Sequence, residues 1–147
     1  MALTVSRDFP THGVDVERVG RRARFASLAE RHFAPSEIAA LSREPEETVP
    51  ERFFAYWTLK ESYIKADGAG LAIPLDQFAF ELDRGPEIGL WLAPERADDP
   101  RAWWFDRYRV GEEHRVAIGA RVGVGHAVFL SACVLSDTSL LKMNTRS

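Results

Sequence analysis

The chain has 147 residues, a hydrophobic fraction of 46% and a formal net charge of −3. This length predicts one domain with enough apolar residues for a core, and the slightly acidic balance excludes the strongly basic footprint of a nucleic-acid-binding protein. The longest apolar run, residues 127–135, is too short to span a bilayer. A single cysteine, Cys133, allows no internal disulfide, so we expect a cytoplasmic location.

The first half of the chain is predicted to fold mainly into helices. Strands are expected over 3–6 and 13–17, and helices over 21–32, 36–43 and 50–67. Ser36 is a suitable N-cap for the second helix. Pro50 suits the first turn of the third helix, and Gly68 is a typical stop for it.

The second half is predicted to fold into strands after a bend over 68–74. These strands are expected over 77–83, 88–92, 102–110, 113–121 and 126–134. The polar connection 93–100 is predicted to be mobile. Residues 137–147 are predicted to be a frayed tail, which leaves 1–136 as the domain. Helices followed by a run of strands indicate an α+β fold, with an antiparallel sheet packed against a long helix.

Two acids stand in the early strand, in the string Gly13-Val14-Asp15-Val16-Glu17. The period of a strand sends both acids to one face, about 7 Å apart. One Mg²⁺ could lie near both, because this ion takes one or two carboxylates and keeps its other positions for water and phosphate oxygens. The alternative is an ordinary solvent-exposed strand edge.

A second charged group lies on the predicted helix 50–67. Glu61 stands four residues after Trp57 and four before Lys65, so the three share one stripe, and Lys60 flanks it. The alternative is a surface Glu–Lys pair worth a few tenths of a kcal/mol. These charges stand at the edge of the apolar face, where burying a charge pair without a function would be costly, and this argues against the surface-pair alternative.

These strings, G-x-D-x-E followed by W-x-x-K-E-S-x-x-K-x-x-G-x-G, resemble the 4′-phosphopantetheinyl transferase superfamily over roughly residues 4–120. The resemblance is closer to the surfactin-synthetase-activating type, whose fold has two similar halves, and the match is to the C-terminal half. It implies a Mg²⁺-dependent enzyme that moves 4′-phosphopantetheine from coenzyme A to a serine of an acyl or peptidyl carrier protein and releases 3′,5′-ADP, which is holo-[acyl-carrier-protein] synthase activity.

The resemblance also implies roles for individual residues. Asp15, Glu17 and Glu61 would hold Mg²⁺. Glu61 would also be the base for the serine hydroxyl, directly or through a water. Lys65 would be catalytic and would bind the pyrophosphate of coenzyme A, with Lys60 a weaker candidate for the same contact.

The half that would supply the basic residues for the 3′-phosphate is not matched. Three explanations stay open: a start placed too late, a homo-oligomer in which a second copy replaces that half, or a non-catalytic truncated half-domain that binds a partner chain or a carrier protein. A basic group, Arg18, Arg21, Arg22 and Arg24, is either a solvated helix face or a docking surface for an acidic carrier protein.

Overall fold

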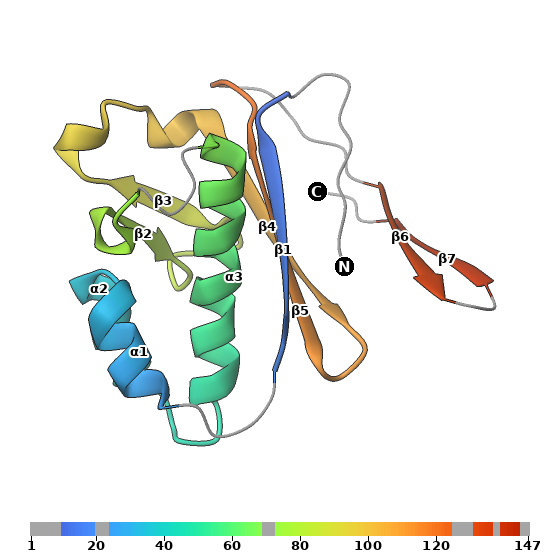
Figure 1. Cartoon of the computed structure of the whole chain (residues 1–147), viewed down its shortest axis with the longest axis horizontal. Coiled ribbons are helices and arrows are strands. Elements are labelled where there is room, and N and C mark those ends of the chain that lie inside the picture. Colours follow the sequence, from blue (N-terminus) through green and yellow to red (C-terminus); the bar gives the residue numbers. More distant parts are fainter. Residues whose placement is uncertain (1–9, 20–23, 69–72, 125–130, 137–138, 145–147) are drawn as a thin grey trace.

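Helix α3 (Val49–Asp67) lies between two layers of secondary structure (Figure 1). On one side is a three-stranded antiparallel sheet with the strand order β1-β5-β4. On the other side are two short helices and a hairpin. The computed structural model describes residues 10–19, 24–68, 73–124, 131–136 and 139–144. The α+β fold with an antiparallel sheet against a long helix, predicted from the sequence, is confirmed.

The remaining elements of the described residues include the other predicted helices and strands, together with strand β7 and short 3₁₀ turns that were not predicted. They are β1 (His12–Arg18), α1 (Phe25–His32), α2 (Pro35–Leu41), β2 (Phe78–Glu81), β3 (Gly89–Leu92), β4 (Trp103–Val110), β5 (His114–Arg121), β6 (Ser131–Ser136), β7 (Ser139–Asn144) and the 3₁₀ turns η2 (Leu75–Gln77), η3 (Pro94–Arg96) and η4 (Pro100–Ala102). The expected strand 3–6 and the start of the one over 126–134 lie outside the described residues. None of the helices within the described ranges is long and apolar enough to cross a bilayer.

The ends of the helices mostly follow their local sequence. Gly68 ends α3 with a φ of +76°, a left-handed conformation that glycine adopts without strain. The predicted N-cap of α2 is wrong: Ser36 lies inside the helix, which begins at Pro35 after Ala34. Proline suits this first position because its missing N–H would have no partner there. The Glu37 carboxylate accepts the N–H of Ala34 at 2.9 Å instead.

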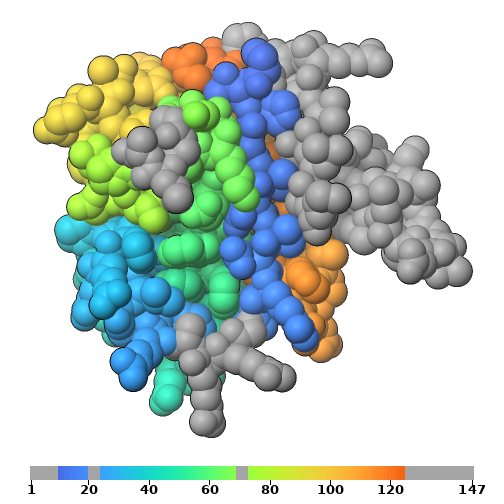
Figure 2. Space-filling model, in the orientation of Figure 1, coloured from blue at the N-terminus to red at the C-terminus, as the bar shows by residue number. Residues whose placement is uncertain are grey.

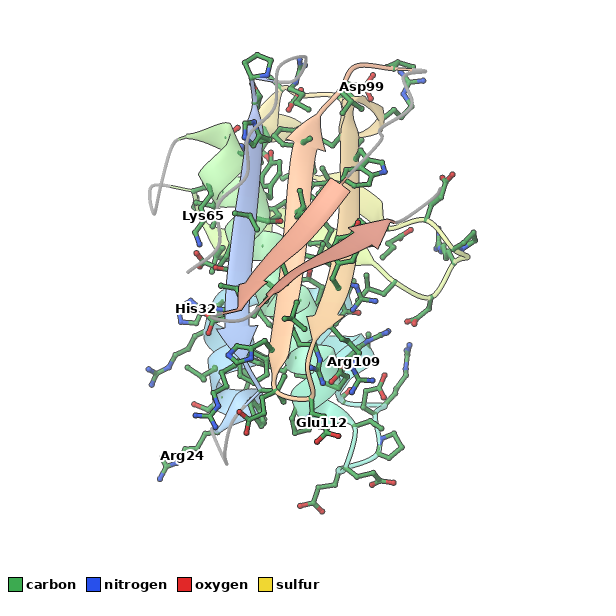
Figure 3. The ribbon with its side chains drawn as sticks, turned by 90° about the vertical axis from the view of Figure 1, so that its right-hand side faces the viewer. Arg24, His32, Lys65, Asp99, Arg109 and Glu112 are labelled. Carbon is green, nitrogen blue, oxygen red and sulfur yellow. The ribbon has the colours of Figure 1, made fainter. Side chains whose placement is uncertain are left out.

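Two segments of the second half contain regular structure that the sequence analysis did not predict. The connection 93–100 contains the turn η3, and Asp98 accepts a hydrogen bond from Trp103 Nε1 at 2.7 Å. Strand β7 pairs with β6 within the stretch predicted as a tail. This hairpin lies on the side of the three-stranded sheet opposite α3 (Figures 1 and 3).

The core surrounds α3 on both sides. Leu59 and Tyr63 of this helix are fully buried, and the Tyr63 ring lies 4.6 Å from that of Phe78 and 4.7 Å from that of Trp103. A helix covered on two sides needs apolar residues around most of its circumference. The few charged residues that α3 places among them therefore need specific partners.

Candidate functional site

Strand β1 runs against α3 at unusually close range. Gly13 of β1 pairs with Gly119 of β5, and both face the helix at Ser62. A Cβ atom on Gly13 would lie 2.3 Å from the Ser62 carbonyl oxygen and 2.6 Å from the Ala66 nitrogen. The absence of side chains at these glycines lets strand and helix meet along one face of the molecule (Figure 2, β1 in blue and α3 in green).

This contact brings the predicted acids and one predicted lysine together. Asp15, only 5% exposed, lies two residues beyond Gly13 on the same face of β1. Lys65 Nζ donates to Asp15 Oδ1 at 2.6 Å. The other oxygen, Asp15 Oδ2, is buried and has no hydrogen-bond partner among the described residues. Lys65 is therefore paired across the interface with Asp15, and no ion pair with Glu61 is found among the described side chains.

The charges around Asp15 perturb one another. Burial, and after it the charge of Asp15, raises the pKa of Glu61. The same two causes raise the pKa of Glu17, and a hydrogen bond from the Trp57 side chain partly opposes them. Both carboxylates thus lie in a partly dehydrated place with an excess of negative charge. A cation close to the three acids would relieve that repulsion.

The three acids carry oxygen ligands that suit a hard cation, although they do not form a complete coordination site in this structure. Among the described residues, no three His, Cys, Asp or Glu side chains lie close enough together to hold a metal. The Lys65 ammonium stands beside Asp15, where a cation would be expected, and Asp15 Oδ2 remains unused. Carboxylate oxygens are the ligands that Mg²⁺ prefers. The oxygen donors therefore suit Mg²⁺ in kind, but in this structure Lys65 occupies the Asp15 oxygen and the described acids do not surround one position.

Replacing Lys65 by methionine should tighten the binding of Mg²⁺ alone by about tenfold, which corresponds to roughly 1.4 kcal/mol. The reason is competition, since the ammonium now neutralises the Asp15 oxygen that the ion needs. Calorimetric titration with Mg²⁺ measures the effect, with Asp15→Asn as a control that should abolish binding. Unchanged or weaker Mg²⁺ binding by Lys65→Met would show that the two cations do not compete.

Lys60 has different surroundings from those expected of a phosphate contact. Its side chain is 1% exposed, and Nζ lies 2.8 Å from Glu37 Oε2. It also donates to the carbonyl oxygens of Leu75 and Phe78, both at 2.6 Å. Because an ammonium has three donors, these three contacts use all the donors of Lys60 in this structure, and the contact of either lysine with a phosphate stays a prediction.

Sequence reasoning missed the residues that set the spacing of the site. Gly119 and Ser62 carry no chemistry, and their contact depends on the register between β1 and β5. The basic group is only partly described. Arg18 pairs with Glu113, Arg24 is exposed, and Arg21 and Arg22 lie outside the described residues. Its use as a docking surface stays a prediction.

Comparisons with known proteins point to one family. Residues 12–119 match the model of the 4′-phosphopantetheinyl transferase superfamily. The chain is 27% identical over 108 residues to the 4′-phosphopantetheinyl transferase Sfp of Bacillus subtilis (strain 168), covering 74% of this chain and 46% of that protein. It is 43% identical over 82 residues to the 4′-phosphopantetheinyl transferase HetI of Nostoc sp., covering 56% of this chain and 34% of HetI.

Solved structures share the fold. The holo-[acyl-carrier-protein] synthase of Thermotoga maritima superposes with a TM-score of 0.61 at 19% identity, over 93% of this chain and 83% of that one. The synthase of Neisseria meningitidis gives 0.55 at 17% identity, over 76% and 97%. The matched part of the chain spans 46% of the length of Sfp and 34% of the length of HetI, so it covers less than half of either relative. With the family model matched across the sheet and α3, the chain belongs to the 4′-phosphopantetheinyl transferase superfamily.

Proposed function

We propose that this chain carries the metal-binding part of a 4′-phosphopantetheinyl transferase. In this reaction a carrier-protein serine attacks the β-phosphorus of coenzyme A, and 3′,5′-ADP leaves. The observation that carries the proposal is the contact between Asp15 and Lys65 beside Glu61, because it joins a metal ligand to a phosphate-binding cation. Family membership supports it. The single cysteine suits a reducing cytoplasm.

Each residue has a distinct task in this proposal. Asp15, Glu17 and Glu61 would hold Mg²⁺, which would supply positive charge to offset that of the pyrophosphate. Lys65, whose side chain is 47% exposed, can turn from Asp15 to the pyrophosphate. Glu61 accepts the proton of the serine hydroxyl, directly or through a water. Phosphoryl transfer needs mainly positioning and charge neutralisation, which these residues supply.

Glu61→Gln should lower the rate of transfer at least about 100-fold, because the amide removes both a metal ligand and a proton acceptor. The measurement is transfer of the arm from coenzyme A to a panel of apo carrier proteins, followed by mass spectrometry. Glu47→Gln is the matched control, since Glu47 is exposed and distant in sequence from the site. If Glu61→Gln keeps its fold and a near-normal rate of transfer, Glu61 is neither the metal ligand nor the proton acceptor.

A second copy of the chain is our proposal for what completes the site. The matched part is 46% of Sfp, yet the synthase structures that share the fold are covered over 83% and 97% of their length. A chain of this size is therefore compatible with the fold of the shorter proteins. Calorimetry with coenzyme A, with and without Mg²⁺, together with the mass in solution, tests this. Mg²⁺-dependent binding by an oligomer supports it, and a folded monomer that binds no coenzyme A contradicts it.

The partial match to longer relatives also favours a second candidate function. The chain could be a non-catalytic half-domain that binds a partner chain or a carrier protein. In that case we expect the chain to bind an apo carrier protein without transferring phosphopantetheine to it at any Mg²⁺ concentration. Transfer above background by the purified chain would exclude it.

A further inference from the structure

A second charged site lies near the other end of α3, in a cavity of about 230 Å³ between the helix and strands β4 and β5. Glu51 and Thr58 line it from the helix, and Arg107, Arg109 and Arg115 line it from the strands. Glu51 precedes Glu61 by ten residues, which is about 15 Å along a helix. Figure 3 shows Lys65 beside β1 and Arg109 at the opposite edge of the sheet, so the two sites are separate.

One of the three arginines is already neutralised. Arg115 is 7% exposed, and its Nε and Nη2 donate to the Glu51 carboxylate at 2.6 to 2.8 Å. Its Nη1 donates to the carbonyl oxygens of Glu112 and His114. The pKa of Glu51 is lowered mainly by its hydrogen bonds with Arg115. Arg115 and Glu51 thus form a fixed wall of the cavity.

The other two arginines have no such partner. Arg107 and Arg109 are two residues apart on β4, so both leave the strand on the face toward α3. Neither guanidinium makes a hydrogen bond or an ion pair with any residue in the described ranges. Burial, and after it the nearby charge of Arg52, lowers the pKa of Arg107. The charges of Glu51 and Asp106 partly oppose these two effects on Arg107, but neither carboxylate is bonded to the Arg107 or Arg109 guanidinium in the described residues, so both groups line the cavity with their N–H donors unused.

We propose that this cavity binds the phosphate group of a small anionic ligand through Arg107 and Arg109. Guanidinium groups present paired N–H donors that match phosphate oxygens. A phosphate would accept hydrogen bonds from the two unpaired guanidinium groups, and the cavity volume leaves room for part of an attached group. This inference does not depend on the proposed transferase activity, because it uses none of the residues assigned to that reaction.

The test is an NMR titration of the full chain with inorganic phosphate and with glycerol 3-phosphate, without Mg²⁺ and at constant ionic strength. Saturable shifts are expected at the Nε–H groups of Arg107 and Arg109. The double variant Arg107→Gln/Arg109→Gln, followed at the backbone amides of β4 and β5, should weaken binding at least tenfold. Arg43→Gln/Arg84→Gln, which removes two exposed arginines elsewhere, should not change it.

Phosphate binding by other variants tests whether the cavity acts independently of the candidate metal site. Asp15→Asn should bind phosphate as the wild type does, which separates this cavity from the candidate metal site. Loss of phosphate binding in Asp15→Asn, or its survival in the Arg107/Arg109 double variant, would overturn the proposal. Binding of a hexaglutamate peptide by a chain that ignores both phosphates would also overturn it, in favour of an acidic protein surface as the occupant.

Discussion

Replacing Lys60 by methionine is expected to lower the free energy of unfolding by about 3–5 kcal/mol. Lys60 and Glu37 form an ion pair at 2.8 Å in which both side chains are almost completely buried. Burial lowers the pKa of Lys60 and raises that of Glu37, so each charge depends on the other. Methionine fills a similar volume but leaves the Glu37 carboxylate without a positive partner.

The loss should extend beyond the pair. The Lys60 ammonium also binds the carbonyl oxygens of Leu75 and Phe78, and Glu37 accepts the N–H of Phe80 at 2.9 Å. One buried pair therefore joins α2, α3 and β2, and its removal leaves several buried polar groups without partners. Each such group adds to the cost of the substitution.

Urea unfolding measures this effect as a lower midpoint with an unchanged slope. Lys65→Met on the same helix is the matched control. Its loss of stability should be smaller, because the Lys65 side chain is 47% exposed whereas both partners of the Lys60 pair are buried. A loss below about 1 kcal/mol for Lys60→Met, with a weakened interaction with coenzyme A, would return Lys60 to the phosphate-binding role that the sequence suggested.

The fold could be predicted from the sequence where local rules decide it. Pro50 and Gly68 bracket α3 to within one residue, because proline and glycine act on the backbone directly. The strand over 13–17 follows from the alternation of valines and acids. Strand β7 was not predicted, because the polar composition of residues 137–147 hides a pairing that depends on β6.

The site could be predicted only in part, because contacts between distant residues have no local pattern. Helical spacing suggested a pair of Glu61 with Lys65, whereas β1 supplies the partner, Asp15, from 50 residues away. Lys60 and Glu37 lie 23 positions apart, and only the packing of α2 on α3 joins them. The arginine cavity depends on the register that sets Arg109 opposite Arg115.

Gly13→Ala should destabilise the fold by about 3 kcal/mol and weaken Mg²⁺ binding, since overpacking of a well-filled contact costs about 1–3 kcal/mol or more. The new methyl group would lie 2.3 Å from the Ser62 carbonyl oxygen and 2.6 Å from the Ala66 nitrogen. These are helix backbone atoms, which cannot turn aside as a flexible side chain can. Strand β1 must therefore move away from α3, and Asp15 moves with it.

Gly111→Ala is the matched control for that displacement. Gly111 lies in the turn between β4 and β5 at a φ of +61°, with open space around its Cα. Its substitution should cost roughly 1–2 kcal/mol of backbone strain and leave the affinity for Mg²⁺ unchanged. Urea unfolding and calorimetric Mg²⁺ titration of both variants give the comparison. If Gly13→Ala loses stability but keeps its Mg²⁺ affinity, the close approach of β1 to α3 serves the fold alone. If both fall together, this approach is what sets the geometry of the carboxylates.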